Sequence, residues 1–235
     1  MLVTVIIPTY NAGPLLKEAL DSILNQTHKE LEIIVIDDGS TDGSVDISYT
    51  KDPRVQYAGL SPNQGKSVAM NMGLDLAKGV YFALQDADDI SLPDRIAVQV
   101  EHLEKHPNLA GVYVNSVWEW SNGTVERNRF RSPMPPSMCN FYISRGISVG
   151  HDPCVMYRTD IARKYPYDPA LRIGQGIDVN LRIGEEHAVE VLKADLYIHR
   201  PRMTGTVRSN LGRKEEEYLL VKQKRLARIA RRNTK

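Results

Sequence analysis

Apolar runs that alternate with helical patterns constrain the fold of this 235-residue chain more than any other feature. Runs rich in β-branched residues, which favour strands, occupy 2–7, 31–36, 54–58 and 80–84. Helical patterns follow at 14–24, 65–78 and 93–105. Alternation of this kind predicts an α/β fold with a mostly parallel sheet flanked by helices.

The second half of the chain is less regular. Strand patterns lie at 110–120, 154–158 and 189–198, and a turn at 121–124 predicts that 125–130 pairs back on the first of them. Three prolines in 132–137 predict a loop, and helical patterns lie at 179–183 and 215–232. We therefore expect a smaller second sheet and a C-terminal helix.

Composition narrows the class of protein. The formal net charge of +1 argues against a nucleic-acid binder, although residues 211–235 hold nine Lys and Arg against three Glu. Cys139 and Cys154 form no CxxC pair, and segment 151–154 lacks the second half that a zinc site needs. No signal-like or membrane-length apolar run is present, so we expect a reducing, cytoplasmic location.

Three carboxylates, Asp86, Asp88 and Asp89, directly follow the strand pattern at 80–84. Two like charges about 5 Å apart repel by roughly 3 kcal/mol at an effective dielectric near 20, so a cation is expected to offset them. Mg²⁺ and Mn²⁺ prefer carboxylate oxygens and often bridge them to substrate phosphates. The alternative is a solvated acidic turn before the next helix, because Asp is favoured in turns and at helix starts.

Polar segments end three of the predicted strands, at 8–11, 37–42 and 86–89. In parallel sheets, ligands bind beyond the carboxyl ends of the strands. We therefore expect the three segments to face one crevice. That convergence favours a metal that holds a phosphorylated substrate.

The segments also carry motifs. Residues 5–11 read Val-Ile-Ile-Pro-Thr-Tyr-Asn, and residues 32–42 read Glu-Ile-Ile-Val-Ile-Asp-Asp-Gly-Ser-Thr-Asp. Asn-Gln-Gly-Lys at 63–66 and Leu-Gln-Asp-Ala-Asp-Asp at 84–89 follow in order. Together they resemble the motifs of glycosyltransferase family 2, the last one its DxD block. A weaker resemblance continues at 151–158, 178–183 and 197–199.

The resemblance implies a GT-A fold with a Rossmann-like sheet, a nucleotide-sugar donor such as a UDP-sugar, and Mn²⁺ or Mg²⁺. It implies transfer of the sugar to a hydroxyl of a glycan, a lipid-linked molecule or another acceptor, most often with inversion. Residues 1–110 would bind the nucleotide-sugar, residues 111–205 of the same domain would bind the acceptor, and residues 206–235 would form a basic helix.

The resemblance also implies roles for single residues. Asp38 would hydrogen-bond the base, Asp86 would lie near the ribose, and Lys66 would approach the diphosphate. Asp88, Asp89 and His199 would hold the metal. The expected donor-binding residues are Pro8, Thr9, Tyr10, Asp37, Asp38, Asn63, Gly65, Lys66, Asp86 and Ala87.

The catalytic base is where the chain departs from the family pattern. The chemistry needs a carboxylate that takes the proton of the acceptor hydroxyl, and the family carries an acidic pair for it. Here Gln175 and Gly176 stand at those positions. Three explanations remain: Asp178 is the base; the alignment is shifted and Asp168 or Glu185–Glu186 supplies it; or the protein binds a nucleotide-sugar without efficient transfer.

Two further predictions concern the C-terminal part. Arg200, Arg202 and Arg208 surround His199, and Gly205 suits a lid that orders over the donor diphosphate. In the tail helix, the basic residues and the apolar residues lie on different faces. That helix is expected either to rest on an anionic membrane, where lipid-linked acceptors occur, or to pack on the body with its basic face in water. The basic residues are Lys224, Arg228 and Arg231, and the apolar ones are Leu219, Leu226 and Ala230.

Overall fold

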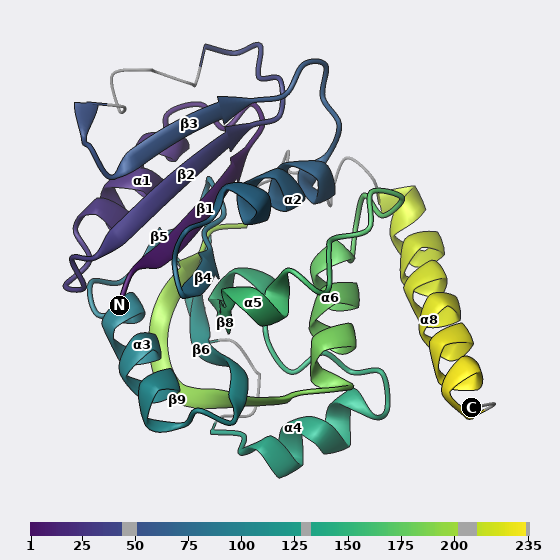
Figure 1. Ribbon diagram of the computed structural model, residues 1–235. Coiled ribbons are helices and arrows are strands. Elements are labelled where there is room, and N and C mark those ends of the chain that lie inside the picture. Colours follow the sequence, from purple (N-terminus) through teal and green to yellow (C-terminus); the bar gives the residue numbers. More distant parts are fainter. Residues whose placement is uncertain (44–50, 128–132, 202–210, 234–235) are drawn as a thin grey trace.

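The computed structural model of the chain describes residues 1–43, 51–127, 133–201 and 211–233 (Figure 1). Its strands are β1 (Val3–Thr9), β2 (Leu31–Asp37), β3 (Val55–Gly59), β4 (Tyr81–Leu84), β5 (Ile90–Ser91), β6 (Leu109–Glu119), β7 (Val125–Arg127), β8 (Val155–Arg158) and β9 (Ala188–His199). Its helices are α1 (Leu15–Leu24), α2 (Lys66–Leu76), α3 (Arg95–Lys105), α4 (Pro136–Ile143), α5 (Thr159–Ala162), α6 (Gln175–Gly184) and α8 (Leu211–Asn233), with a 3-10 turn at Asp152–Cys154.

One sheet joins these strands in the order β3-β2-β1-β4-β8-β6-β9-β5, and β7 pairs with β6. The first four strands of this order are parallel to one another. β8 then pairs antiparallel with β4, so the later strands continue the same sheet rather than forming the separate smaller one that we expected. The predicted α/β class is confirmed.

Helices cover both faces of the sheet, because the side chains of each buried strand alternate between the two faces (Figure 1). On one face, Val5 and its odd-numbered neighbours pack with α1 and α3. On the other face, Ile6 and Ile34 pack with α2, and the same core continues to α4 and α6. The apolar runs of β1 and β2 are therefore buried on both sides, which is typical of parallel strands.

The proline-rich segment 132–137 is not entirely a loop. Helix α4 begins at Pro136, with Pro135 as its N-cap residue. Proline is tolerated in a first helical turn, because its fixed φ suits the helix and its missing N–H would have no partner there. The predicted pairing of 125–130 is present for Val125–Arg127, and residues 128–132 lie outside the described part of the chain.

Strand β9 links the later part of the sheet to the acidic segment. It runs parallel to β6 over most of its length, and its end pairs Ile198 with Ile90 of the short strand β5. Figure 1 shows β9 curving beneath the other strands. This path brings residues near 199 next to Asp89, more than 100 positions earlier. Among the described residues, no helix is long and apolar enough to cross a membrane.

Candidate active site

The polar segments that follow β1, β2 and β4 lie at one edge of the sheet, as expected. Thr9 and Asp37 are partners in the β1–β2 register, and the Asp38 N–H donates to the Thr9 carbonyl oxygen at 2.8 Å. On the other side of β1, the Gln85 N–H donates to the Ile6 carbonyl oxygen at 3.0 Å. The end of β1 therefore lies between the ends of β2 and β4.

Asp38 fastens the start of helix α2 to the end of β2. Its carboxylate is 4% exposed and accepts hydrogen bonds from the N–H groups of Gln64 and Gly65, each at 2.7 Å. The Asn63 side-chain amide donates to it at 2.9 Å. Gly65 has a φ of 96°, which favours glycine. These contacts bring Asn63, Gly65 and Asp38 together, as the sequence predicted.

Asp37 and the residues after β1 form the neighbouring wall. Asp37 accepts hydrogen bonds from the Ser40 N–H at 3.0 Å and from the Tyr57 hydroxyl at 2.9 Å. The Tyr10 side chain is 50% exposed, so its ring is available for stacking against a flat base. Pro8 is half-buried and Thr9 is buried, and the Thr9 hydroxyl oxygen has no hydrogen-bond partner among the described residues.

Lys66 and Asp86 form an ion pair across this edge, with Nζ 2.5 Å from Oδ1. Burial opposes the charge on Lys66, but Asp86, Asp152 and Asp88 outweigh it and raise the pKa of the lysine. Burial likewise opposes the charge on Asp86, but Lys66 holds the pKa of that carboxyl below its usual value. Both side chains are therefore charged near neutral pH. Ala87, the next residue along the chain, is buried.

Asp89 is held entirely by protein groups. Its side chain is 0% exposed. One oxygen accepts the Tyr197 hydroxyl at 2.9 Å and lies 3.1 Å from His199 Nδ1, and the other accepts the Arg200 N–H at 2.8 Å. A carboxylate with both oxygens engaged in this way orients His199, and these contacts argue against the prediction that Asp89 itself binds a metal.

Asp88 and His199 remain as possible metal ligands. Asp88 is half-buried, and the His199 side chain is 23% exposed. Burial opposes protonation of His199, but Asp89 outweighs it and raises the pKa of the imidazole. Among the described residues, no group of three or more His, Cys, Asp or Glu side chains is arranged to hold a metal ion, so Asp88, Asp89 and His199 do not form the expected three-residue site.

Asp178, the residue predicted to be the catalytic base, is held in a buried ion cluster. Its carboxylate is 2% exposed. One oxygen lies 2.7 Å from Arg182 Nε of the same helix, and the other lies 3.1 Å from Arg228 of α8. A base must reach the proton that it removes. These contacts argue against Asp178 as the base.

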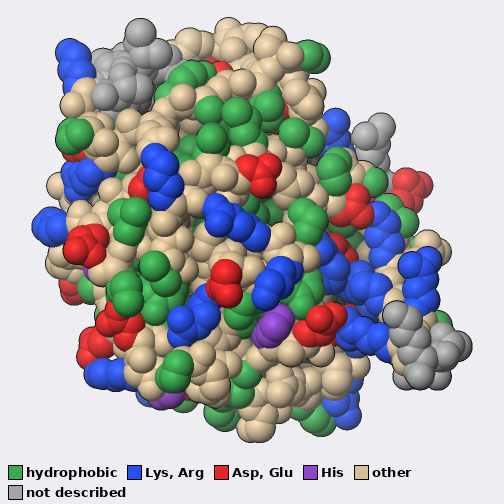
Figure 2. Space-filling view, viewed as in Figure 1, with side chains coloured by type: hydrophobic (Ala, Val, Ile, Leu, Met, Phe, Trp, Pro, Cys, Tyr) green, Lys and Arg blue, Asp and Glu red, His purple; other side chains and the backbone are tan. Residues whose placement is uncertain are grey.

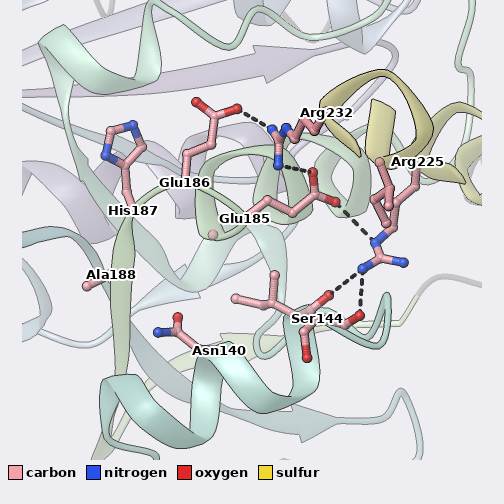
Figure 3. A pocket seen from close by; sticks show the side chains of 11 residues that line it. Asn140, Ser144, Glu185, Glu186, His187, Ala188, Arg225 and Arg232 are labelled. Carbon is pink, nitrogen blue, oxygen red and sulfur yellow. Dashed lines mark hydrogen bonds and ion pairs between the residues drawn. The ribbon is translucent and has the colours of Figure 1, made fainter. Parts of the chain in front are cut away.

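The other carboxylates considered for that role also face α8. Asp168 pairs with Lys224, and Glu185 lies 3.1 Å from Arg225. Glu186 pairs with Arg232. Figure 3 shows Glu185 between Arg225 and Arg232, beside a cavity of about 490 Å³ that α4, α6 and α8 line.

Helix α8 therefore packs on the body through its basic side chains. Figure 2 shows Lys and Arg side chains interleaved with Asp and Glu where α8 meets the body. Leu219 and Leu226 point the other way, and each is 54% exposed. The expectation of a helix packed on the body is confirmed. Of the predicted basic face, Lys224 and Arg228 pair with carboxylates of the body rather than lying in water, whereas Arg231 is exposed. Arg202, Gly205 and Arg208 of the predicted lid lie outside the described residues.

Sequence reasoning gave no role to two residues beside this site. The His151 ring lies 4.8 Å from that of His199, and burial, then His199, lowers the pKa of His151 to about 4. Asp152 follows it in the 3-10 turn before β8. Their segment shows an incomplete zinc motif and a weak resemblance to the family at 151–158, and neither signal places the two residues beside residues 66, 86 and 199.

Comparison with known proteins decides the family. The model of the family described as glycosyl transferase family 2 matches residues 4–166, more than two thirds of the chain. The chain belongs to glycosyl transferase family 2. The match includes the polar segments that follow β1, β2 and β4 and ends before α6.

Curated relatives of the family 2 chain match about half of it. It is 39% identical over 131 residues to an uncharacterized glycosyltransferase of Haemophilus influenzae, a match that covers 53% of this chain and 40% of the relative. It is 41% identical over 105 residues to the putative teichuronic acid biosynthesis glycosyltransferase TuaG of Bacillus subtilis, covering 43% and 42%. The chain thus spans under half the length of these relatives, and 17% of a Rickettsia felis glycosyltransferase that it also matches.

Solved structures show the same fold. Residues 1–349 of TarS from S. aureus, in complex with UDP-GlcNAc, align with a TM-score of 0.72 at 20% identity over 89% of this chain and 61% of that one. The mannosyltransferase PcManGT of Pyrobaculum calidifontis, in complex with GDP-Man and Mn²⁺, aligns with a TM-score of 0.65 at 21% identity over 87% and 58%. The fold is GT-A, as the resemblance implied.

Proposed function

We propose that this family 2 chain is a metal-dependent glycosyltransferase that moves a sugar from a nucleoside-diphosphate-sugar to an acceptor hydroxyl, with inversion at the anomeric carbon. The convergence of the donor-side segments at one edge of the GT-A sheet carries the proposal. Those segments supply an exposed aromatic ring, a carboxylate that ties two loops together and a charged Lys66–Asp86 pair. Structural neighbours crystallised with UDP, UDP-GlcNAc or GDP-Man support it.

The donor would lie along this edge, with its base at the end of β1 and its diphosphate toward Asp88. Tyr10 would stack on the base, and Asp38 would hydrogen-bond it beside Asp37. Lys66 would bring a positive charge to the phosphates while Asp86 contacts the ribose. Pro8, Thr9, Asn63, Gly65 and Ala87 would shape the walls.

A divalent metal fits the residues present. Asp88 offers carboxylate oxygens, and His199 uses Nδ1 toward Asp89, an arrangement that orients a metal-binding imidazole through its other nitrogen. Mg²⁺ and Mn²⁺ commonly take one or two protein ligands and complete their shell with phosphate and water. When bound, such a metal would offset the charge that develops on the departing diphosphate. Lys66 would stabilise the same charge from the protein side.

The acceptor is proposed to bind on the side built by residues 111–205, and residues 1–110 to bind the donor. TuaG is named for teichuronic acid biosynthesis, which supports a glycan or lipid-linked acceptor here. Lys224, Arg225 and Arg228 of α8 pair with the body, so a membrane contact of this helix would use the exposed Leu219 and Leu226 together with the exposed Arg231.

The alternative is a homologue that binds a nucleotide-sugar and transfers it weakly or not at all. It is favoured by one observation, that Gln175 and Gly176 replace the acidic pair of the family pattern. The two proposals predict the same donor binding and differ in turnover.

Thermal-shift measurements with UDP- and GDP-sugars, each with Mn²⁺ and with a chelator, test donor binding. We expect at least one nucleotide-sugar to stabilise the protein with metal, and Asp88→Asn to abolish that stabilisation. Asp75→Asn changes an exposed carboxylate of α2 and should leave it intact. If no nucleotide-sugar stabilises the protein under any of these conditions, the proposed function is wrong.

A further inference from the structure

Asp152 carries a carboxylate at the donor site that no basic residue neutralises by direct contact in the described structure. Its side chain is half-buried, and its Oδ1 atom is buried without a hydrogen-bond partner among the described residues. An unpaired buried oxygen costs about 1–3 kcal/mol in proteins. Such a cost is common at functional sites, where the missing partner is a ligand.

The position of Asp152 depends on Gly176. A Cβ atom placed on Gly176 would lie 2.2 Å from Cγ of Asp152 and 2.3 Å from its Oδ2. No real side chain tolerates such contacts, so the Asp152 carboxylate fills the space in which a side chain at 176 would begin. The first turn of α6 therefore has a carboxylate beside it that comes from another segment of the chain.

Asp152 also lies near the proposed donor-binding edge, because the 3-10 turn that carries it contacts both β4 and α6. Lys66 and Asp86 are the charged groups that act on it most strongly, and these two residues form the ion pair at the end of β4. The backbone is fixed as well, because the buried Arg95 guanidinium donates to the carbonyl oxygen of Pro153. Asp152 thus stands between the donor-binding edge and helix α6.

The other carboxylates of this half do not offer the same chemistry. Asp178, Asp168 and Glu185 each contact a cationic side chain of helix α8. A carboxylate that neutralises a cation is a weaker base, because losing its charge would strand that cation.

We propose that Asp152 is the general base of the transfer, in place of a carboxylate on α6. The proposal rests on the proposed function. Asp152 Oδ1 accepts the proton of the acceptor hydroxyl while the hydroxyl oxygen attacks the anomeric carbon of the donor sugar. The bond between that carbon and the phosphate oxygen breaks, and its electron pair leaves with the nucleoside diphosphate.

The acidity of Asp152 suits this task. Burial raises the pKa of its carboxyl to about 6, although the charge of Lys66 lowers it. The base must be ionised, so kcat should fall as the pH drops through about 6. The titratable groups that face Asp152 are Lys66 of α2, Asp86 after β4, Tyr113 of β6, Tyr157 of β8 and Tyr167 before α6.

Removal of the carboxylate is the first test. In Asp152→Asn we expect kcat to fall by about 10²–10⁴, the usual contribution of a general base, while UDP-GlcNAc or GDP-mannose still binds. Asp160→Asn, an exposed carboxylate of α5, is the matched control. Turnover is followed as transfer to an acceptor panel and as slow hydrolysis of the donor, in which water is the acceptor.

The second test moves the carboxylate. A Cβ on Gly176 would also lie 2.6 Å from Cβ of Asp152, so Asp152→Gly, which removes that atom with the carboxylate, clears the space beside α6. The double variant Asp152→Gly with Gly176→Asp returns a carboxylate to it from the helix, and we expect it to recover at least tenfold of the activity that Asp152→Gly loses. A role of Asp152 in folding alone would give no such recovery.

The outcomes separate this proposal from the proposed function. If wild type binds no nucleotide-sugar, the function itself is wrong. If wild type binds donor but neither transfers nor hydrolyses it, or if Asp152→Asn retains full turnover, Asp152 is not a base and the donor site stands. If Asp178→Asn abolishes turnover and Asp152→Asn does not, the base is Asp178.

Discussion

The Arg95→Met variant should unfold at a markedly lower temperature than the wild-type protein, although Arg95 is not one of the proposed donor-binding residues. The Arg95 side chain is 0% exposed, and each of its five N–H bonds has an acceptor. The acceptors are the carbonyl oxygens of Leu84 and Pro153, the side-chain oxygens of Gln85 and Gln99, and the Ser91 hydroxyl.

The size of the loss follows from that count. A hydrogen bond contributes about 1 kcal/mol net, and one from a charged donor about 1.5–3 kcal/mol. Burial lowers the pKa of Arg95 because it disfavours the charge, so part of the gain is offset by desolvation. Methionine keeps the length of the side chain and removes all five donors. We expect a loss of about 3–5 kcal/mol, and at 2–4 °C per kcal/mol for a chain of this size the Tm falls by roughly 6–20 °C.

Differential scanning calorimetry gives the Tm of Arg95→Met and of a control variant, Arg145→Ala. Arg145 is an exposed arginine, and its loss should lower the free energy of unfolding by under about 0.5 kcal/mol. If Arg95→Met has the same Tm as the wild-type protein, the reasoning is refuted, because the five hydrogen bonds would then contribute nothing to stability. Where the variant stays folded at low temperature, its turnover should also fall, because Arg95 positions Pro153 beside Asp152.

Three further predictions follow from the described contacts. Gly176→Ala places a Cβ against Asp152 and should destabilise the protein by about 1–3 kcal/mol in urea titrations, whereas equal stability would show that Asp152 can move away. Asp38→Ala leaves two loop N–H groups without an acceptor and should abolish the rise in Tm that a nucleotide-sugar causes. If that rise is unchanged, Asp38 does not bind the nucleotide base. Hydrogen bonds from Arg54 hold the pKa of Asp52 at about 2, below its unfolded value. The stability from this pair is therefore full above about pH 4 and lost as the pH falls through about 2. The difference in Tm between the wild-type protein and Asp52→Asn should therefore narrow as the pH falls from about 4 to about 2. A difference that stays constant would show that ionisation of Asp52 does not contribute to stability.

The convergence of the polar segments after β1, β2 and β4 could be predicted from sequence because its information is local. Each strand pattern is followed within a few residues by its polar segment, and the rule that ligands bind at the carboxyl ends of parallel strands places the segments together. Asp38 and Asn63 meet because β2, β3 and α2 follow one another along the chain, so the end of β2 and the start of α2 lie at the same edge of the sheet. The alternation of strand and helix patterns already implies this connection.

The arrangement around α6 and α8 depends on contacts that sequence patterns do not encode. Asp152 and Gly176 lie 24 positions apart, and only packing shows that one fills the space left by the other. The amphipathic pattern of α8 showed two faces but not which one meets the body. Lys224, Arg225 and Arg228 turn inward because Asp168, Asp178 and Glu185 form an acidic surface that no single segment displays. Helix α4 was missed because prolines indicate loops more often than first turns.

The contacts of Asp89 set an order of events during protein synthesis. Its carboxylate is held by Tyr197, His199 and Arg200, which follow it by 108, 110 and 111 residues. At about 5–20 residues per second, a ribosome needs roughly 5–20 s to make that stretch. A nascent chain that already has β1 to β4 therefore carries the Asp89 carboxylate without the groups that hold it, although Asp86 already has Lys66 as its partner. The edge of the sheet beside Asp89 is therefore complete only when β9 has emerged and paired with β5.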